Sequence, residues 1–278
     1  MFDNPNKNAY CHSKNEEVND CNDHCRNDLL RMINCPSFLS GMSHEMRTHM
    51  NSIVAFSFLM NNSNISDEEK KEFSNHILSS CEQLMFLFDN FFDSAIIDTG
   101  NSKAEPRECN PVSLIDELMS EIRTILKRND YKDLVLILEN QAHNNHEDIL
   151  IDSYRVIRVL RNLFQNALSN TKTGYIKIGY RMDESDITYY VLDSGNGYQK
   201  SADLLQTEDL QESLQKYNDT SSAINLHVAK KLVNLMGGTI WVENNGISGT
   251  AFYFRIPAKR VYSTNVQLNQ YTRTKIAI

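Results

Sequence analysis

Two segments near the start of the chain carry apolar residues at the spacing of an α-helix. In the first, steps of three and four residues make a heptad seam: Leu39, Met42, Met46, His49, Ile53, Phe56 and Met60. In the second, a similar stripe is formed by Phe73, Ile77, Cys81, Leu84, Phe88, Phe91 and Ala95. Ser66, with Glu69 three residues later, predicts a capping box that begins the second helix. These patterns predict an antiparallel helical hairpin. Because its seams would be half exposed alone, we expect a homodimer that closes a four-helix bundle.

Helical and strand patterns alternate in the second half of the chain. Helical periodicity marks residues 111–128, 152–171 and 225–238, and strand-like runs mark residues 131–140, 174–182, 186–193, 239–244 and 250–257. Asp152 is a predicted N-cap, Gly237 a predicted helix end, and a polar loop is expected after Asp193. This order predicts an α/β sandwich, with a mostly antiparallel sheet under a layer of helices.

The two patterns divide the chain into five parts. We predict a polar N-terminal arm over residues 1–30 and the helical hairpin over residues 31–100. A linker with little apolar content follows over residues 101–110, and the α/β sandwich domain occupies residues 111–258. Residues 259–278 form a polar tail.

Composition narrows the classes of protein that fit this organisation. The 278 residues are 41% hydrophobic, with a formal net charge of −8 and a pI of about 5.5. This balance argues against nucleic-acid binding through phosphate contacts. No run approaches the roughly 18 apolar residues of a membrane span, because Asp89 and Asp93 interrupt the richest one. The polar start does not resemble a signal peptide, so we expect a cytoplasmic protein.

Cysteine and histidine residues cluster in the N-terminal arm. Five potential metal ligands occur close together: Cys11, His12, Cys21, His24 and Cys25. Their spacing matches no standard zinc pattern, so we interpret the cysteines as reduced thiols. A metal site in this segment is the alternative.

Polar residues at special positions suggest candidate chemistry. With the seam as the buried side, His44 falls on the opposite, outward face of its helix, beside Glu45. Arg158, Asn162 and Asn166 form a polar stripe at steps of four residues. Amide oxygens suit Mg²⁺ that also takes phosphate oxygens, although a solvated helix face is the alternative.

A strand that ends in Asp193, followed by Gly195 and Gly197, places a carboxylate beside a glycine loop. Such a carboxylate can accept a hydrogen bond from the exocyclic amine of adenine, although an ordinary turn is the alternative. The helix predicted to begin at Asn225 would offer free N–H groups to phosphate, and Lys230 and Lys231 either add charge there or are surface residues.

Taken together, residues 35–258 resemble the two-component sensor histidine kinases, which join a dimerisation and phosphotransfer hairpin to a GHKL-type ATP-binding domain. The phospho-acceptor box is matched by Phe38, Leu39, Met42, Ser43, His44, Glu45, Arg47, Thr48 and Asn51. The N box is matched from Asp152 to Thr171, and the first glycine box by Asp193, Gly195 and Gly197. The sequence from Lys230 to Phe254 matches the segment after the second glycine box.

This resemblance implies a role for each matched residue. His44 would receive the γ-phosphoryl group of ATP, Glu45 would act as general base, and Thr48 would position water to dephosphorylate a response regulator. Asn166 would hold Mg²⁺, Asn162 would frame the phosphates, and Asp193 would recognise adenine with Thr250 nearby. The phosphoryl group would then pass to an Asp in the receiver domain of a separate response regulator.

Three departures from the family pattern bear on activity. His49 replaces a proline, and Ser169 stands where a lysine is usual. The second glycine box reads Ser-Ser-Ala-Ile-Asn-Leu over residues 221–226, without its three glycines. Because Ser and Ala resist the positive φ that glycine permits, we expect weakened ATP binding or slower transfer.

These departures keep two alternatives open beside an active kinase. The first is a pseudokinase that docks a response regulator, with phosphatase action through Thr48. The second is another ATPase of the same fold, which the His-bearing hairpin argues against.

Overall fold

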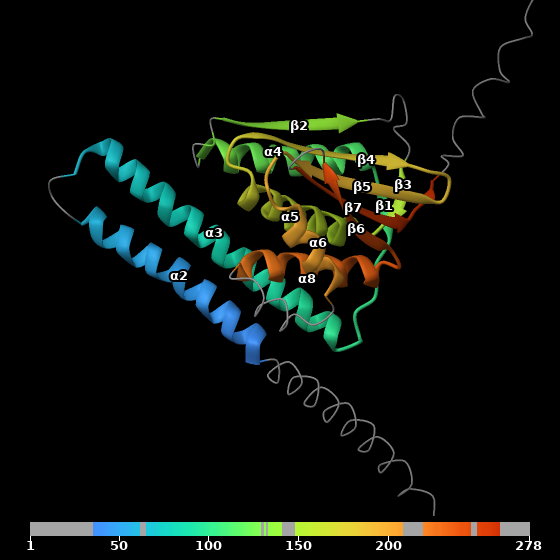
Figure 1. The fold of residues 1–278 in the computed structure, drawn as a ribbon, viewed down its shortest axis with the longest axis horizontal. Coiled ribbons are helices and arrows are strands. Elements are labelled where there is room, and N and C mark those ends of the chain that lie inside the picture. Colours follow the sequence, from blue (N-terminus) through green and yellow to red (C-terminus); the bar gives the residue numbers. More distant parts are fainter. Residues whose placement is uncertain are drawn as a thin grey trace, which may run out of the picture. The chain divides into compact units, whose positions relative to one another are not determined.

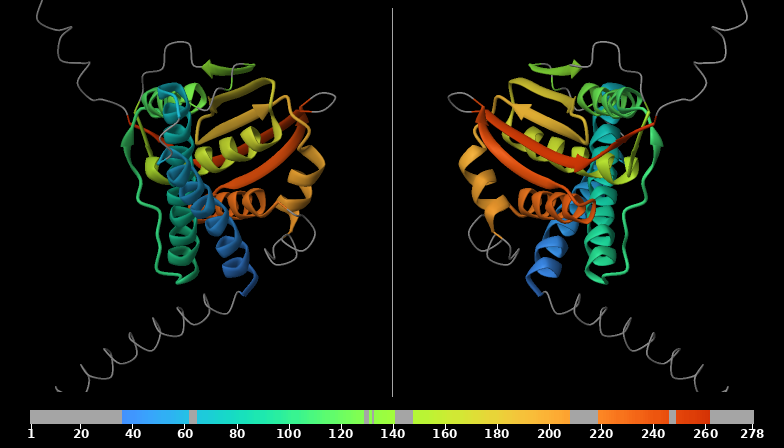
Figure 2. Two further views of the ribbon diagram at one scale, coloured as in Figure 1. Left: turned by 90° about the vertical axis from the view of Figure 1, so that its left-hand side faces the viewer. Right: turned by 90° about the vertical axis from the view of Figure 1, so that its right-hand side faces the viewer.

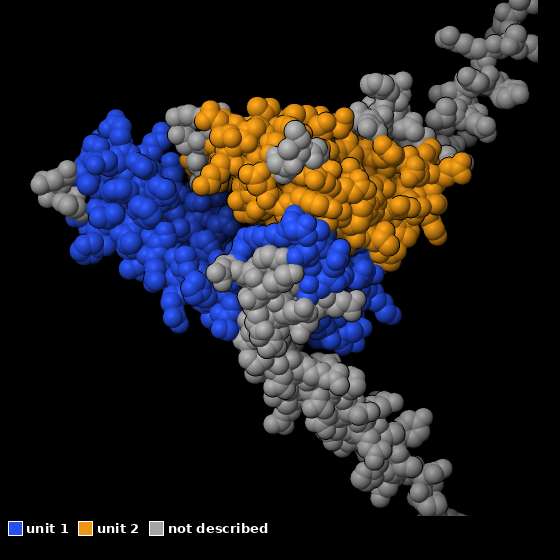
Figure 3. Space-filling model, in the orientation of Figure 1, with its two compact units in different colours: residues 1–103, 199–235 blue, residues 104–198, 236–278 orange. Residues whose placement is uncertain are grey.

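The computed structural model describes residues 36–61, 65–128, 131, 133–140, 148–207, 219–245 and 249–261. The predicted arm, with its cysteine and histidine cluster, lies outside the described residues, as does the tail beyond residue 261. Two compact units are present, each built from segments distant in the sequence. One comprises Met1–Lys103 with Gln199–Leu235, and the other Ala104–Tyr198 with Met236–Ile278 (Figure 3).

The first unit contains the predicted helical hairpin. Helix α2 (Pro36–Met60) and helix α3 (Asp67–Asp98) run side by side in opposite directions (Figure 1). The capping box is confirmed, because the Glu69 backbone N–H donates to Ser66 Oγ at 3.2 Å and the Ser66 backbone N–H donates to Glu69 Oε2 at 2.8 Å. The Phe56 ring of α2 stacks on His76 of α3, with 4.5 Å between ring centroids. Helix α2 is therefore continuous and closely packed on its neighbour.

The predicted seam of α2 is its less exposed side. Met42 is 2% exposed, and the remaining described seam residues are half-buried: Met46, His49, Ile53, Phe56 and Met60. In α3, Phe88 of the predicted stripe is 43% exposed in the single chain, whereas Leu87 beside it is 3% exposed. Helix α3 also packs against α8 (Thr220–Leu235) and so buries a wider face than a hairpin seam.

Helix α8 begins five residues before the predicted start at Asn225, which corrects that prediction. Asp219 precedes the first turn, where its carboxylate accepts from the Ser222 backbone N–H at 3.0 Å and from Ser222 Oγ at 2.8 Å. The backbone N–H groups near Asn225 therefore lie inside a helix. The position predicted to bind phosphate is for that reason not the start of a helix. The predicted end is confirmed by Gly237, which has a φ of 72°.

The predicted polar loop after Asp193 also contains a helix, α6 (Tyr198–Gln206). Leu204 and Leu205 of α6 are buried, and Lys230 Nζ of α8 donates to the Leu205 carbonyl at 3.0 Å. A nine-residue helix shows little periodicity in sequence, which explains why it was not predicted.

The second unit is the predicted α/β sandwich. Its main sheet has the order β2-β4-β5-β7-β6, antiparallel except for the β2–β4 pair. The strands are β2 (Leu134–Asn140), β4 (Gly174–Met182), β5 (Asp186–Asp193), β6 (Thr239–Asn245) and β7 (Gly249–Pro257). Helices α4 (Pro111–Arg128) and α5 (Ser153–Asn170) cover one face of this sheet (Figures 1 and 2). The core lies between them, with Val156, Leu163, Ile176, Val191 and Phe252 fully buried.

A small second sheet joins three segments for which no strand was predicted. Strand β3 (Ile149–Ile151) pairs with β1 (Arg107–Cys109) and with β8 (Lys259–Arg260). The segment predicted as a linker thus contains β1, and the predicted tail begins with β8. Burial raises the pKa of the Cys109 thiol to about 11, and Asp148 contributes, so this thiol is inert at neutral pH.

None of the helices in the described ranges combines the length and the apolar character needed to cross a membrane.

Both hairpin helices carry a second apolar stripe that the single chain leaves exposed. On α2, Met50, Val54 and Phe58 are 55%, 66% and 78% exposed. On α3, Phe92 and Ile96 are 56% and 53% exposed. Apolar stripes this regular are typical of surfaces that another helix covers.

We predict that these stripes hold two copies of the chain together. Replacing Val54 or Phe92 by Glu places a charge in the dimer core, so each variant should sediment as a monomer at concentrations where the wild type is a dimer. Lys71→Glu, at an exposed polar position of α3, is the matched control and should remain dimeric. Dimers in both apolar variants would contradict the assignment.

The half-buried His49 ring is the one ionisable group among the described seam positions of α2. Burial lowers its pKa below the ordinary value of 6.5, and the nearby Glu45 carboxylate raises it in part. The folded state therefore resists protonation of His49, whereas the unfolded chain takes up the proton near its ordinary pKa.

We predict that His49 makes the protein less stable as the pH falls below about 6.5, because protons then bind preferentially to the unfolded state. His49→Leu should flatten the dependence of the unfolding free energy on pH between pH 7.5 and 5.5, measured in urea. Met46→Leu, one turn away in the same seam, should keep the wild-type slope. The same slope in His49→Leu would contradict the argument.

Candidate functional site

His44 lies on the exposed side of α2, as the seam predicts. The Thr48 hydroxyl donates to the His44 backbone carbonyl at 3.1 Å, which is a local bond within the helix. Glu45 is half-buried, and its Oε2 accepts a hydrogen bond from Ser221 Oγ of α8 at 3.0 Å. The expected base is thus engaged by a residue that stands in the altered second glycine box.

Further polar contacts hold α8 on α3, and no sequence pattern predicts them. Asn90 Nδ2 donates to Asn225 Oδ1 at 3.0 Å, and both side chains are buried, at 0% and 5% exposed. Lys231 Nζ donates to Ser94 Oγ at 3.0 Å and to both carboxylate oxygens of Asp98, at 2.6 and 2.7 Å. Lys231 is therefore an ion-pair residue in this structure, and Asn225 occupies another position of the altered box.

In the second unit, the polar stripe of α5 is buried. Arg158, Asn162 and Asn166 are 1%, 0% and 1% exposed, which rules out a solvated helix face. Asn162 Nδ2 donates to the Arg158 backbone carbonyl at 2.9 Å. Amides are kept in a helix interior at a cost in helix propensity, so a buried pair of this kind favours a specific polar role.

Asp193 ends β5 and is 1% exposed. Its Oδ1 accepts from the Gly195 backbone N–H at 2.8 Å, and it pairs with Thr250 across the β5–β7 ladder. Burial raises the pKa of the carboxyl, while the Gly195 backbone N–H and the neighbouring Thr250 and Thr171 oppose that rise. Thr171, the residue after α5, thus joins the predicted site although it was expected only as part of the N-box pattern.

The two glycines after Asp193 are required by packing on the end of α5. A Cβ on Gly195 would come within 2.1 Å of the Asn170 carbonyl oxygen, and one on Gly197 within 2.8 Å of the Asn170 side chain. Any larger residue would push the loop away from α5. The glycines therefore fix where Asp193 lies relative to the buried amides.

These geometries define two sets of groups. The first unit offers an exposed imidazole beside a carboxylate, a combination suited to nucleophilic chemistry with proton removal. The second offers a buried carboxylate and buried amides, suited to recognition of a polar base and of phosphates. Within the described ranges, no group of three or more His, Cys, Asp or Glu side chains is arranged to hold a metal ion.

Two family models match the chain in this order. Residues 37–100 match the His Kinase A (phospho-acceptor) domain. Residues 151–260 match the histidine kinase-, DNA gyrase B- and HSP90-like ATPase.

Similar proteins come from bacteria and from a social amoeba. The chain is 27% identical over 234 residues to the sensor protein EvgS of Escherichia coli, covering 80% of this chain and 19% of EvgS. It is 26% identical over 248 residues to the autoinducer 2 sensor kinase/phosphatase LuxQ of Vibrio parahaemolyticus, covering 86% of this chain and 28% of LuxQ. It is 28% identical to the hybrid signal transduction histidine kinase K of Dictyostelium discoideum, covering 86% of this chain and 21% of that kinase. The chain thus spans less than a third of the length of these relatives.

Solved structures share the fold. The histidine kinase AdeS of Acinetobacter baumannii aligns with a TM-score of 0.54 at 18% identity, over 77% of this chain and 97% of AdeS. The histidine kinase ThkA, in complex with the response regulator protein TrrA, aligns with a TM-score of 0.54 at 22% identity, over 84% of this chain and 64% of that chain. The exposed His44 lies in the region that matches the phospho-acceptor domain, and the buried Asp193 lies in the region that matches the ATPase domain. The chain therefore belongs to the two-component histidine kinases.

Proposed function

We propose that this chain transfers the γ-phosphoryl group of ATP to His44 and then to an Asp of a separate response regulator. The observation that carries the proposal is the exposed His44 imidazole beside Glu45, in a chain with both a phospho-acceptor domain and an ATPase domain. In the transfer, one ring nitrogen of His44 attacks the γ-phosphorus, the bond to the β–γ bridging oxygen breaks, and ADP leaves. The proton on the other ring nitrogen passes to Glu45.

The second unit is the proposed nucleotide-binding part. The solved histidine kinase ShkA, in complex with AMPPNP, aligns with a TM-score of 0.51 at 19% identity, which supports an ATP-binding fold. Asp193 is the proposed acceptor for the adenine amine, because its carboxylate is buried and fixed by Gly195 and Thr250. A buried acceptor of this kind discriminates strongly against bases that lack the donor.

The amide stripe of α5 fits a nucleotide-bound Mg²⁺. An amide oxygen is a hard neutral ligand, and a metal held by few protein groups takes its other ligands from phosphate and water. Asn166 would hold the ion, with Asn162 beside the phosphates. When bound, Mg²⁺ would stabilise the charge that develops on the transferred phosphoryl group.

The proposed partner is the receiver domain of a response regulator. ThkA, one of the structures that share this fold, was solved with such a regulator. The exposed side of α2 presents His44 and Thr48 one helical turn apart, so an incoming Asp and an attacking water would meet neighbouring side chains. We propose that Thr48 positions this water when the regulator is dephosphorylated.

The kinase proposal makes a direct prediction for labelling. With γ-labelled ATP and Mg²⁺, the full chain should acquire label that is lost in acid and kept in alkali, as expected for a phosphorus–nitrogen bond. His44→Gln should abolish the label, because the attacking nitrogen is removed while the exposed position leaves the fold intact.

Asp193→Asn separates binding from chemistry in the same assay. It should lose both the label and ATP affinity, measured by calorimetry, whereas His44→Gln should still bind ATP. Absence of label on the wild type, together with normal binding of a response regulator, would favour the pseudokinase alternative instead.

Helix α8 also affects the proposed base. Ser221 donates to Glu45, while Asn225 and Lys231 fasten the same helix to α3. In this conformation, one oxygen of the base is therefore occupied by α8. We propose that Glu45 is released from Ser221 before it accepts the proton.

Ser221→Ala should therefore speed labelling of His44 by about two- to tenfold, because a hydrogen bond of this type contributes about 0.5–1.5 kcal/mol. Initial rates at saturating ATP are the appropriate measurement. Ser57→Ala, at an exposed position of α2, is the matched control and should leave the rate unchanged. An equal or slower rate in Ser221→Ala would show that the contact does not hold back the base.

A further inference from the structure

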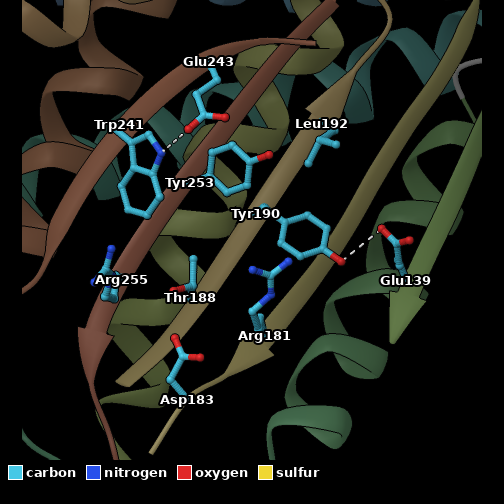
Figure 4. Close-up of a pocket in the computed structure, with 10 residues that line it drawn as sticks. All are labelled: Glu139, Arg181, Asp183, Thr188, Tyr190, Leu192, Trp241, Glu243, Tyr253 and Arg255. Atoms are coloured by element: carbon cyan, nitrogen blue, oxygen red, sulfur yellow. Dashed lines mark hydrogen bonds between the residues drawn. The ribbon is translucent and has the colours of Figure 1, made fainter. Parts of the chain in front are cut away.

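The face of the main sheet opposite α4 and α5 carries a cavity that the proposed kinase reaction does not use. Along each strand, residues facing the helices are buried, such as Ile178, Val191 and Phe252, while their neighbours point the other way. These outward residues line an open cavity of about 400 Å³ (Figure 4). This volume lies in the range of small-molecule sites.

A row of aromatic rings forms the floor of this cavity. Tyr190, Tyr253 and Trp241 are in register on three neighbouring strands. The Trp241 and Tyr253 rings stack with 5.3 Å between centroids, and Tyr253 and Tyr190 are 6.1 Å apart. Trp241 and Tyr253 are half-buried and Tyr190 is 7% exposed, so the row gives the cavity a continuous aromatic lining against which a planar aromatic ligand can pack.

Tyr190 is held in place by two neighbours. A Cβ on Gly179 would come within 2.4 Å of the Tyr190 hydroxyl, so only glycine allows the ring to lie across β4. The hydroxyl then donates to Glu139 Oε2 at 3.1 Å, and Glu139 pairs with Lys177 at 3.3 Å. Burial, followed by Glu139, raises the pKa of Tyr190 well above its ordinary value, so it remains a neutral donor. The floor is therefore preorganised.

Two arginines flank one end of the row. Arg181 and Arg255 both pair with Thr188, which puts their Cα atoms about 10 Å apart across the strands. Arg255 lies over the Trp241 ring, 5.6 Å from its centroid. In the described part of the chain, neither guanidinium forms a salt bridge.

Acidic residues give the two ends of the cavity opposite charge. Asp183 lines the arginine end, which therefore carries one net positive charge. At the other end Glu243 accepts from Trp241 Nε1 at 3.0 Å. Figure 4 shows the Arg181 guanidinium beside Tyr190, and Glu243 beyond Trp241. An anionic group fits only at the arginine end.

We propose that this cavity binds a small planar aromatic carboxylate. Its ring packs against Tyr253 and Trp241, with Tyr190 at the base of the cavity, and its carboxylate lies near Thr188 between Arg181 and Arg255. Guanidinium groups recognise carboxylates by paired hydrogen bonds, and here they need not first give up another ion pair. The site is separate from the proposed ATP site, because it lies on the opposite face of the sheet from α5.

The test uses 2-naphthoate and the full chain. Trp241 is the only tryptophan of the 278 residues, so its indole N–H gives a single resonance that reports on this cavity alone. We expect a saturable shift with a Kd of about 0.1–1 mM, as befits so small a ligand. The shift should persist with saturating ATP. The neutral analogue 2-naphthalenemethanol, and also 2,6-naphthalenedicarboxylate with a second acid toward Glu243, should bind at least about fivefold more weakly.

Substitution of the two arginines tests where the carboxylate of 2-naphthoate binds. Arg181→Gln and Arg255→Gln should each weaken 2-naphthoate binding at least about fivefold, while Arg123→Gln, exposed on α4, should not. No saturable shift up to 10-fold above the expected Kd range, or equal binding of acid and neutral analogue, would overturn the proposal. A Trp241 resonance that moves with protein concentration without ligand would also overturn it, because another copy of the chain would then cover this face.

Discussion

The buried carboxylate of Asp193 is the constraint on which the proposed nucleotide site depends. An ionised group at 1% exposure loses the hydrogen bonds of water, so the fold has to replace them. The Gly195 N–H does so only because the loop packs directly on Asn170, where a side chain at position 195 has no room. Thr250 contributes only if β7 keeps its register with β5. The Asp193 carboxylate therefore constrains the end of α5, the glycine loop and the sheet register together. The buried amides of α5 lie near the same loop.

The altered second glycine box has a structural consequence of its own. Residues 221–226 form the first turns of α8, with Asp219 as the cap. A glycine-rich loop has no side chains with which to contact the helical hairpin, whereas this segment supplies Ser221 to Glu45 and Asn225 to Asn90. The buried Asn pair is the stronger constraint, because replacing either residue would leave the other amide buried without its partner. Without its glycines, the segment 221–226 has less backbone freedom, but its side chains make defined contacts with the hairpin.

Much of the fold could be predicted because strong patterns repeat over many residues. The bounds of α4, the Asp152 cap of α5, the Ser66 capping box and the outward direction of His44 all followed from spacing. Short elements could not be predicted, since β1, β3 and α6 are stabilised by neighbours distant in sequence rather than by their own periodicity. The packing of α8 on α3 is likewise a tertiary contact that no local pattern predicts. Individual residues of the candidate site were identified by type, but the contacts of Ser221, Asn225 and Lys231 depend on where α8 begins.

His44 is the proposed phospho-acceptor despite the altered glycine box. The most direct measurement locates the phosphoryl group by mass spectrometry of peptides prepared at neutral to alkaline pH, after brief incubation of the full chain with ATP and Mg²⁺. We expect a phosphoryl group on the peptide that contains His44, carried by the imidazole ring. A chain saturated with ATP that carries no phosphoryl group there, or carries it on another residue, would contradict the assignment of His44.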